Sequence, residues 1–154
     1  MKNVAMARLV GVLYRQSLNY MHYALKSMGI TPLECIFLAA LFDCEGASQE
    51  QLCSMLVIDK SATAKAMKSL EDKGLVKRDQ CLNDKRAKRI STTAKARGLR
   101  KDIDIMMRQW VDFLTEDMEA GGLDQAVQSL NAMAARAVRA DHRALLKGMK
   151  GGKK

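Results

Sequence analysis

Several residue patterns are scarce in this 154-residue chain, and their absence excludes whole classes of protein. Pro32 is the only proline, so little interrupts helices, and the abundant Ala, Leu, Met, Lys and Arg favour them. No apolar run approaches the roughly 18 residues of a membrane-spanning helix. The N-terminus lacks the apolar stretch and cleavage pattern of a secretory signal. We therefore expect a mainly helical, cytoplasmic protein with no membrane partner.

The residue groups of metal centres and catalytic sites are also scarce. The chain contains four cysteines without C-x-x-C spacing and two isolated histidines. This pattern predicts no metal site, and in a reducing cytosol the thiols are most simply free. No nucleophile–base pair, carboxylate dyad or Gly-rich phosphate loop is recognisable, so we expect no catalytic residues and no cofactor.

Positive charge, in contrast, is in excess and is unevenly distributed. The net charge is +9, and residues 77–101 contain ten Lys or Arg against two acidic residues, which gives this segment +8. Such a basic segment is typical of a nucleic-acid binder. A solvated face and a patch for anionic membranes are the alternatives. DNA is favoured because the segment coincides with the hairpin pattern described below.

Helical patterns occupy the first half of the chain. Apolar residues three or four apart predict an amphipathic helix over residues 3–28. Thr31-Pro32-Leu33-Glu34 is a T-x-x-E capping box with proline at the first helical position, which predicts a helix over 32–44. A second box, S-x-x-Q, opens a helix over 48–56, and a fourth helix is expected over 59–73.

Two strands and further helices follow Gly74. Residues 75–79 and 88–92 are the only plausible strands, and a charged loop joins them. Apolar residues then recur at alternating spacings of four and three from Leu99 to Phe113, as in a coiled-coil seam. Gly121-Gly122 interrupts this seam before a last helix.

The order of these elements is that of a winged helix-turn-helix. We predict a single domain over residues 1–154, mainly α with a small β-hairpin wing, in which the winged helix-turn-helix covers 31–92. The helices at 3–28 and 93–147 have more apolar surface than one small module covers, which favours dimerisation helices at both ends of the chain. A monomeric bundle is the alternative. Residues 148–154 are expected to form a flexible tail.

The fourth helix, residues 60–73, is the candidate recognition helix. Its apolar residues can face the core, which leaves Ser61, Lys65 and Lys68 at positions i, i+4 and i+7 on the other side. Lysine reaches phosphate or guanine, and serine binds phosphate or base edges, so this face suits the major groove of DNA. An ordinary exposed polar face is the alternative.

The segment between the strands, residues 80–87, is the candidate wing. Asp84 and Arg86 flank Lys85 in the expected loop, so the carboxylate can pair with the guanidinium and orient it. An arginine on a narrow projection can enter the minor groove. The alternative is a surface ion pair, which contributes only about 0–1 kcal/mol.

The segment from 70 to 92, LEDKGLVKRDQCLNDKRAKRIST, resembles the multiple antibiotic resistance regulator (MarR) family. The family pattern is a leucine and a charged pair before K-G-L/W-V, followed by D-x-R in the wing. The matching residues are Leu70, Lys73, Gly74, Leu75, Val76, Arg78, Asp84 and Arg86. The upstream LVIDKSATAKAM is similar to the family's segment before the recognition helix, and helix order agrees from about residue 5 to 147.

The resemblance implies a homodimer that binds double-stranded DNA at an inverted repeat and is joined through the N- and C-terminal helices. It puts Ser61 and Lys65 on the recognition helix and Arg86 at the wing tip. Ser48 would approach a phosphate at the start of the third helix, which is consistent with free N–H groups there.

Two departures from the family pattern concern the operator and the end of the wing. Ala62 and Ala64 replace hydroxyl residues that are frequent in the family, which leaves fewer contacts to base edges. Ser91-Thr92-Thr93 replaces the usual leucine-threonine after the wing.

Members of the family commonly bind small aromatic anions between the dimerisation helices and the winged module. The effector expected by this resemblance is small and aromatic or anionic. An arginine would pair with an anion, and the other side chains would form apolar and aromatic walls. The candidate pocket residues are Tyr14, Arg15, His22, Met106 and Trp110. Ordinary core packing of these side chains is the alternative.

Redox sensing is a second hypothesis for regulation. Thiol-switching relatives have a reactive cysteine in the first helix, and this chain has none before Cys35. Cys35 and Cys53 lie on apolar faces and are expected to be inert. Cys81 lies among four basic residues, which would lower its pKa, but no resolving cysteine is evident.

Together these patterns predict a dimeric, sequence-specific transcriptional regulator, most simply a repressor relieved by a ligand. The alternative is a winged-helix protein-interaction or architectural module that binds DNA without a specific operator. An enzyme is the least supported class.

Overall fold

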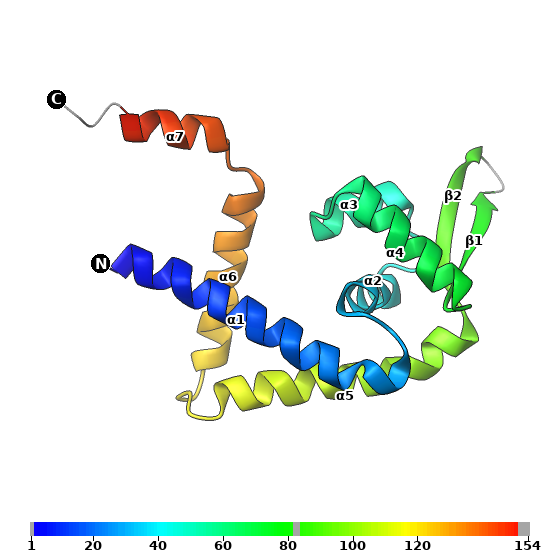
Figure 1. Ribbon diagram of the computed structural model, residues 1–154, viewed down its shortest axis with the longest axis horizontal. Coiled ribbons are helices and arrows are strands. Elements are labelled where there is room, and N and C mark those ends of the chain that lie inside the picture. Colours follow the sequence, from blue (N-terminus) through cyan, green and yellow to red (C-terminus); the bar gives the residue numbers. More distant parts are fainter. Residues whose placement is uncertain (1, 82–83, 151–154) are drawn as a thin grey trace. The chain divides into compact units, whose positions relative to one another are not determined.

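A computed structural model describes the backbone of residues 2–81 and 84–150 and the side chains of residues 4–79 and 88–147. It forms two compact units, Met1–Asp112 and Phe113–Lys154. The first unit contains the helices and the hairpin of a winged helix-turn-helix (Figure 1). Its helices before the hairpin are α1 (Lys2–Ala24), α2 (Pro32–Asp43), α3 (Gln49–Leu56) and α4 (Lys60–Asp72), with a short 3-10 turn, η1 (Lys26–Met28), after α1.

The starts of α2 and α3 confirm the two capping boxes. Thr31 Oγ1 accepts from the Glu34 backbone N–H at 3.2 Å, and Glu34 Oε2 accepts from the Thr31 N–H at 2.7 Å. Ser48 and Gln51 make the same reciprocal pair at 3.2 and 2.8 Å. Each helix therefore begins where two residues, three positions apart, satisfy two backbone donors that would otherwise lack partners.

The fourth predicted helix is present as α4, which ends at Asp72 with Lys73 as its C-cap and has the predicted buried face. Asp59 caps α4 by accepting from the Ala62 N–H at 2.9 Å. Gly74 follows the helix at φ 68°, a left-handed conformation that costs glycine little and lets the chain turn into the hairpin. The buried residues of α4 are Thr63, Ala66, Met67 and Leu70.

The wing is a two-stranded antiparallel hairpin of β1 (Val76–Cys81) and β2 (Asp84–Thr92). Both strands extend further toward the tip than the sequence predicted, because the pairing continues past an irregularity between Gln80 and Cys81 and pairs Cys81 with Asp84. The expected charged loop over residues 83–86 is thus wrong for the backbone of Asp84, Lys85 and Arg86, which belongs to β2.

The segment between α2 and α3 is hydrogen-bonded to β2, a pairing that the sequence analysis missed. The Gly46 N–H donates to the Ile90 carbonyl and the Ile90 N–H donates to the Ala47 carbonyl, both at 3.0 Å. A bridge between Ser48 and Arg89 continues the pairing. The start of α3 is therefore hydrogen-bonded to β2.

The core of the first unit gathers side chains from all of its elements. The largest fully buried residues include Leu25, Phe37, Leu38, Leu41, Leu52, Met67, Leu70, Leu75, Ile90 and Ile103. α5 (Ala94–Thr115) follows the hairpin and contributes Ile103 and Met106 from the predicted seam. Phe113, the last residue of that seam, is 67% exposed.

α5 and the second half of α1 are joined by aromatic side chains. The Tyr20 hydroxyl donates to the Met106 carbonyl at 3.0 Å, and the Trp110 indole N–H donates to Ser17 Oγ at 2.9 Å. The two rings stack with centroids 4.8 Å apart. These contacts fix α1 against α5 within the first unit.

The second unit contains α6 (Gly122–Val138) and α7 (His142–Lys150). The sequence predicted one last helix and a tail from residue 148. The structure has instead a break after Val138 and a second helix that includes residues 148–150. Asp141 Oδ1 explains the restart, because it accepts from the N–H groups of Arg143 and Ala144 at 2.9 and 3.1 Å.

Candidate nucleic-acid interface

The exposed face of α4 is where the sequence placed it. Ser61, Lys65 and Lys68 are all exposed, opposite the buried face of the helix. Ala62 and Ala64 lie at the two flanks and are half-buried. The centre of this face therefore presents one hydroxyl and two ammonium groups.

The two lysines of this face differ in their surroundings. Lys68 Nζ lies 3.0 Å from Asp72 Oδ2, one turn further along the helix, and the sequence analysis did not consider this carboxylate. Lys65 makes no ion pair with another described side chain. Lys65 is therefore the cation that this helix can offer to a phosphate or base without first losing a partner.

The predicted wing contacts fall on side chains outside the described part of the structure. This holds for Asp84, Lys85 and Arg86, whose backbone belongs to β2, and for the Cys81 thiol. The hairpin itself begins two residues after Gly74 and therefore directly follows the recognition helix. The roles assigned to Arg86 and Asp84 stay predictions.

Ser48 lies at the start of α3, but not all the donors around it are available. The Ser48 N–H already donates to Gln51 Oε1, and the Gln51 N–H donates to Ser48 Oγ. A hollow of about 530 Å³ lies beside it and is lined by the α2–α3 segment, the first turns of α3 and Arg89. The predicted phosphate contact of Ser48 would have to use its hydroxyl hydrogen or the neighbouring amides.

Much of the basic segment 77–101 already has partners within the chain. Six of its eight described cations contact a carboxylate or a backbone carbonyl of the same chain. These are Lys77 with Asp79, Arg78 with Glu71, Arg89 with Gly46, Lys95 with Lys73, Arg97 with Thr92, and Arg100 with Asp43. The interpretation of the whole +8 segment as a DNA surface is therefore too simple.

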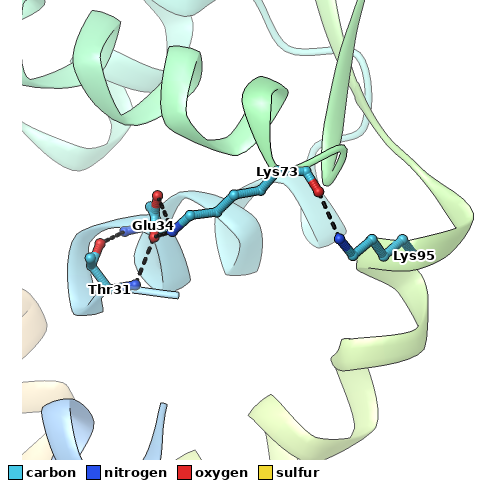
Figure 2. Close-up of polar contacts among 4 residues, drawn as sticks. All are labelled: Thr31, Glu34, Lys73 and Lys95. Atoms are coloured by element: carbon cyan, nitrogen blue, oxygen red, sulfur yellow. Dashed lines mark hydrogen bonds and ion pairs between the residues drawn. The ribbon is translucent and has the colours of Figure 1, made fainter. Parts of the chain in front are cut away.

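One of the motif residues named in the sequence, Lys73, belongs to a network beneath the interface (Figure 2). Lys73 Nζ lies 2.7 and 2.9 Å from the two carboxylate oxygens of Glu34, whose side chain is 3% exposed. Burial by itself raises the pKa of Glu34, but hydrogen bonds from Lys73, Ser69 and the Thr31 backbone outweigh it and leave the pKa below its ordinary value. Glu34 is therefore a charged carboxylate inside the fold.

A second carboxylate, Glu45, joins the α2–α3 segment to the end of β2. It accepts from the Thr92 backbone N–H at 2.6 Å and from the Thr92 hydroxyl at 2.9 Å. Thr92 is buried. The departure at Ser91-Thr92-Thr93 thus supplies a buried hydroxyl partner for Glu45 in place of an apolar side chain.

The predicted effector residues do not gather into one pocket. His22 and Trp110 line a hollow of about 440 Å³ with Gln16, Asn19, Tyr20 and Tyr23. Tyr14 is 65% exposed and Met106 is buried in the core. Arg15 folds back along α1, with its guanidinium 3.1 Å from where a Cβ on Gly11 would stand. Arg15 does not line this hollow, because its side chain lies over its own helix, and its role in an effector pocket stays a prediction.

The described cysteines are free thiols with different exposures. Cys35 is 1% exposed, and burial raises its pKa to about 11, so it stays a thiol at neutral pH. Cys53 is half-buried and Cys44 is exposed. The expectation that Cys35 is inert agrees with its burial.

Two findings concern metal ligands and membrane-spanning helices among the described residues. No three described His, Cys, Asp or Glu side chains gather as metal ligands would. None of the helices within residues 2–81 and 84–150 is long and apolar enough to cross a membrane.

A helix with one buried and one basic face, followed by a hairpin wing, defines a winged helix-turn-helix. Residues 30–88 match the model of the MarR family, so the resemblance predicted from the sequence is confirmed. The chain has the fold of MarR-family transcriptional regulators.

Solved structures similar to the chain cover nearly all of it. A MarR transcriptional regulator from Methanosarcina mazei Go1 is 28% identical, with a TM-score of 0.81 over 87% of this chain and 96% of its own. The transcriptional regulator SlyA is 20% identical, with a TM-score of 0.83 over 87% and 94%. A MarR-family regulator from Listeria monocytogenes, solved with a 26mer DNA, is 22% identical, with a TM-score of 0.82 over 96% of both chains.

Proposed function

We propose that the chain is a cytoplasmic, homodimeric transcriptional regulator that binds an inverted-repeat operator in double-stranded DNA. The observation that supports this most is α4, which is buried on one side and presents Ser61 and Lys65 on the other. With α4 in the major groove, the hairpin that follows it can reach the adjacent minor groove. The Listeria monocytogenes neighbour, whose structure contains DNA, supports the same use of the fold.

The dimer is supported by apolar surface that a single chain leaves uncovered. On α1, Val4, Leu9 and Leu13 are 47–76% exposed. On α6, Val127, Leu130 and Val138 are 47–60% exposed, and no residue of that helix is buried. Exposed apolar faces of this kind mark protein–protein contacts, and a two-fold protein fits a two-fold operator.

The experiment that tests this function is selection of bound sequences from a random pool of duplex DNA, followed by footprinting. We expect an inverted repeat whose half-sites lie about one helical turn apart. Affinity should fall steeply with salt, with a log–log slope of about −0.9 per phosphate neutralised. Recovery of unrelated sequences with equal affinity would reject a specific operator.

A specific observation keeps the architectural alternative open. The flanks of the α4 face are Ala62 and Ala64, and Lys68 is paired with Asp72, so few groups remain to distinguish base edges. A module of this kind would bind DNA through phosphates alone. Its signature is a strong salt dependence without sequence preference, which the same selection distinguishes.

We further infer that a small planar ligand releases the DNA, as in a repressor. The hollow beside Tyr20 and Trp110 has aromatic walls and the amides of Gln16 and Asn19, and its one ionisable nitrogen base is His22. Because Arg15 lies elsewhere, an uncharged aromatic ring with hydrogen-bonding substituents fits this hollow better than an anion does.

The ligand hypothesis has a direct optical test, because Trp110 is the only tryptophan. Titration with phenol should change its fluorescence and weaken DNA binding, whereas benzoate, an anion with the same ring, should do so only at higher concentration. Gln16→Ala should weaken phenol binding, and Gln109→Ala, an exposed neighbour of Trp110 outside the lining, should not. Equal effects of the two variants would reject the hollow as the site.

A further inference from the structure

Lys73 is the point where three helices, α2, α4 and α5, are joined by polar contacts (Figure 2). It is the C-cap residue of α4. Its ammonium group binds Glu34 in the first turn of α2, and its carbonyl accepts from Lys95 Nζ, in the first turn of α5, at 2.8 Å. One residue thus connects the end of the recognition helix to the starts of two other helices.

Both of those starts are close to the proposed dimerisation helices. Only residues 29–31 separate η1, at the end of α1, from α2, so Glu34 lies just beyond the junction with α1. Lys95 belongs to α5 itself, and α5 is fixed to α1 by the Tyr20 and Trp110 contacts. Lys73 is therefore hydrogen-bonded directly to α5, and through Glu34 it is bonded to the part of α2 that lies next to the end of α1.

The Glu34–Lys73 pair also differs from the other ion pairs of α4. The carboxylate of Glu34 is 3% exposed, whereas the Lys60–Glu50 and Lys68–Asp72 pairs are 62–84% exposed. Exposed pairs contribute little and restrain little. α4 has two further polar contacts: Ser69 hydrogen-bonds the same Glu34 carboxylate, and Glu71 pairs with Arg78 at 3.2 Å, with the two side chains 29–42% exposed. Its other contacts with the core are apolar and have no strong directional preference. A charge-assisted hydrogen bond to a buried carboxylate does have one.

We propose that Glu34 and Lys73 are a positioning pair that fixes the tilt of α4 against α1 and α5. In the dimer, this tilt sets the distance between the two recognition helices, and so the half-site spacing that the protein accepts. Neither side chain touches DNA in this role; both act through α4. The inference rests on the proposed dimeric function.

The test compares variants on operators that differ only in spacing. The DNA probes are the duplex selected by the wild-type protein and derivatives with one base pair inserted or removed between the half-sites. The variants are Glu34→Gln and Lys73→Met. Glutamine is accepted at this position of a capping box, so Glu34→Gln keeps the hydrogen bond to the Thr31 N–H and removes only the charge.

We expect both variants to bind the native spacing about tenfold more weakly, a coupling of the usual size, and to discriminate less between spacings. Binding to an isolated half-site should be unchanged, because the exposed face of α4 is intact. Lys73→Arg, which keeps the charge, should restore most of the discrimination. A purely structural role would scale the affinities for every spacing and for the half-site by the same factor, and that result would overturn the proposal.

Thr31→Ala is the matched control for lost stability. It removes the hydroxyl that accepts from the Glu34 N–H and leaves both charges in place, so it should lower the melting temperature without changing the spacing preference. An altered preference in this variant would also contradict the proposal. A wild-type protein with no preferred spacing at all would instead reject the proposed dimeric function, so the two failures can be distinguished.

Discussion

At the scale of single residues, Val57 stands out. It is the C-cap of α3 at φ 54° and ψ 41°, and among the described residues it is the one non-glycine with positive φ. For a β-branched side chain this conformation costs on the order of 1–3 kcal/mol. The side chain is 65% exposed, so packing offsets little of this cost.

Val57→Gly should therefore stabilise the protein. Relief of the left-handed strain exceeds the extra backbone entropy of glycine, and we expect a net gain of about 1 kcal/mol, seen as a melting temperature about 2–4 °C higher. Val57→Ala keeps the Cβ and should gain less. Calorimetry on both variants checks this, and a lower melting temperature for Val57→Gly would show that the valine makes compensating contacts.

Lys65 and Arg86 are the single residues on which DNA affinity should depend most. Lys65→Ala should weaken binding similarly across sequences and reduce the salt slope by about one phosphate. Arg86→Ala should weaken binding without lowering the melting temperature. Lys101→Ala, an exposed lysine on α5 remote from α4 in sequence, is the control with equal loss of charge. Filter binding at several salt concentrations measures all three, and full affinity of Arg86→Ala would reject the wing contact.

At the scale of elements, the sequence predicted what is encoded locally. The capping boxes at Thr31 and Ser48 fixed two helix starts because all their partners lie within four residues. The amphipathic spacing of α4 likewise identified its buried and exposed faces. The fold class could be predicted for the same reason.

Contacts between distant segments could not be predicted in this way. The backbone pairing of Gly46 and Ala47 with Ile90 and the Glu34–Lys73 pair both depend on segments that are brought together only by the fold. The +8 charge of residues 77–101 predicted a nucleic-acid binder. Composition alone, however, cannot distinguish a cation that faces DNA from one that binds a carbonyl group of the protein. At the start of α5, Lys95, Arg97 and Arg100 follow one another every two or three residues. This spacing was the one local sign in the sequence that some of these cations bind groups of the protein itself.

The link between α2 and α4 should make stability depend on pH. The pKa of Glu34 is lower in the folded state than in an unfolded chain, so the unfolded state binds the additional proton. The stabilisation is present in full above the ordinary glutamate pKa of about 4.3 and is lost as pH falls through the folded value.

Urea unfolding of the wild type and Glu34→Gln at a series of pH values measures this link. The wild type should be the more stable at pH 6, and the difference should shrink steadily as the pH falls below about 4. A difference that does not change with pH would mean that the ion pair contributes nothing to folding.

At the scale of the whole molecule, the two units differ in how many apolar side chains each one buries. The first has a continuous core, whereas α6 of the second has no buried residue and exposes Leu123, Val127 and Leu130 on one chain. An isolated helix with such a face is marginal in water. The proposed dimer is the arrangement that covers it.

Leu130→Asp should therefore shift the protein from dimer to monomer. A charge in a buried apolar contact costs at least about 2 kcal/mol, or roughly a 30-fold weaker association. Gln128→Asp, an exposed polar position on the same helix, is the matched control. Light scattering after gel filtration reports the mass, and a Leu130→Asp dimer of unchanged stability would remove α6 from the interface.

The bonds from Glu45 to Thr92 have a consequence for the thermodynamics of recognition. They hold the base of the hairpin against the segment that leads into α3, so two parts of the molecule that we propose face DNA share one mount. The entropy needed to order that mount is lost once, during folding, and not again at each encounter with an operator. For this part of the molecule, binding should therefore show a small heat-capacity change, as expected when preorganised surfaces meet without coupled folding.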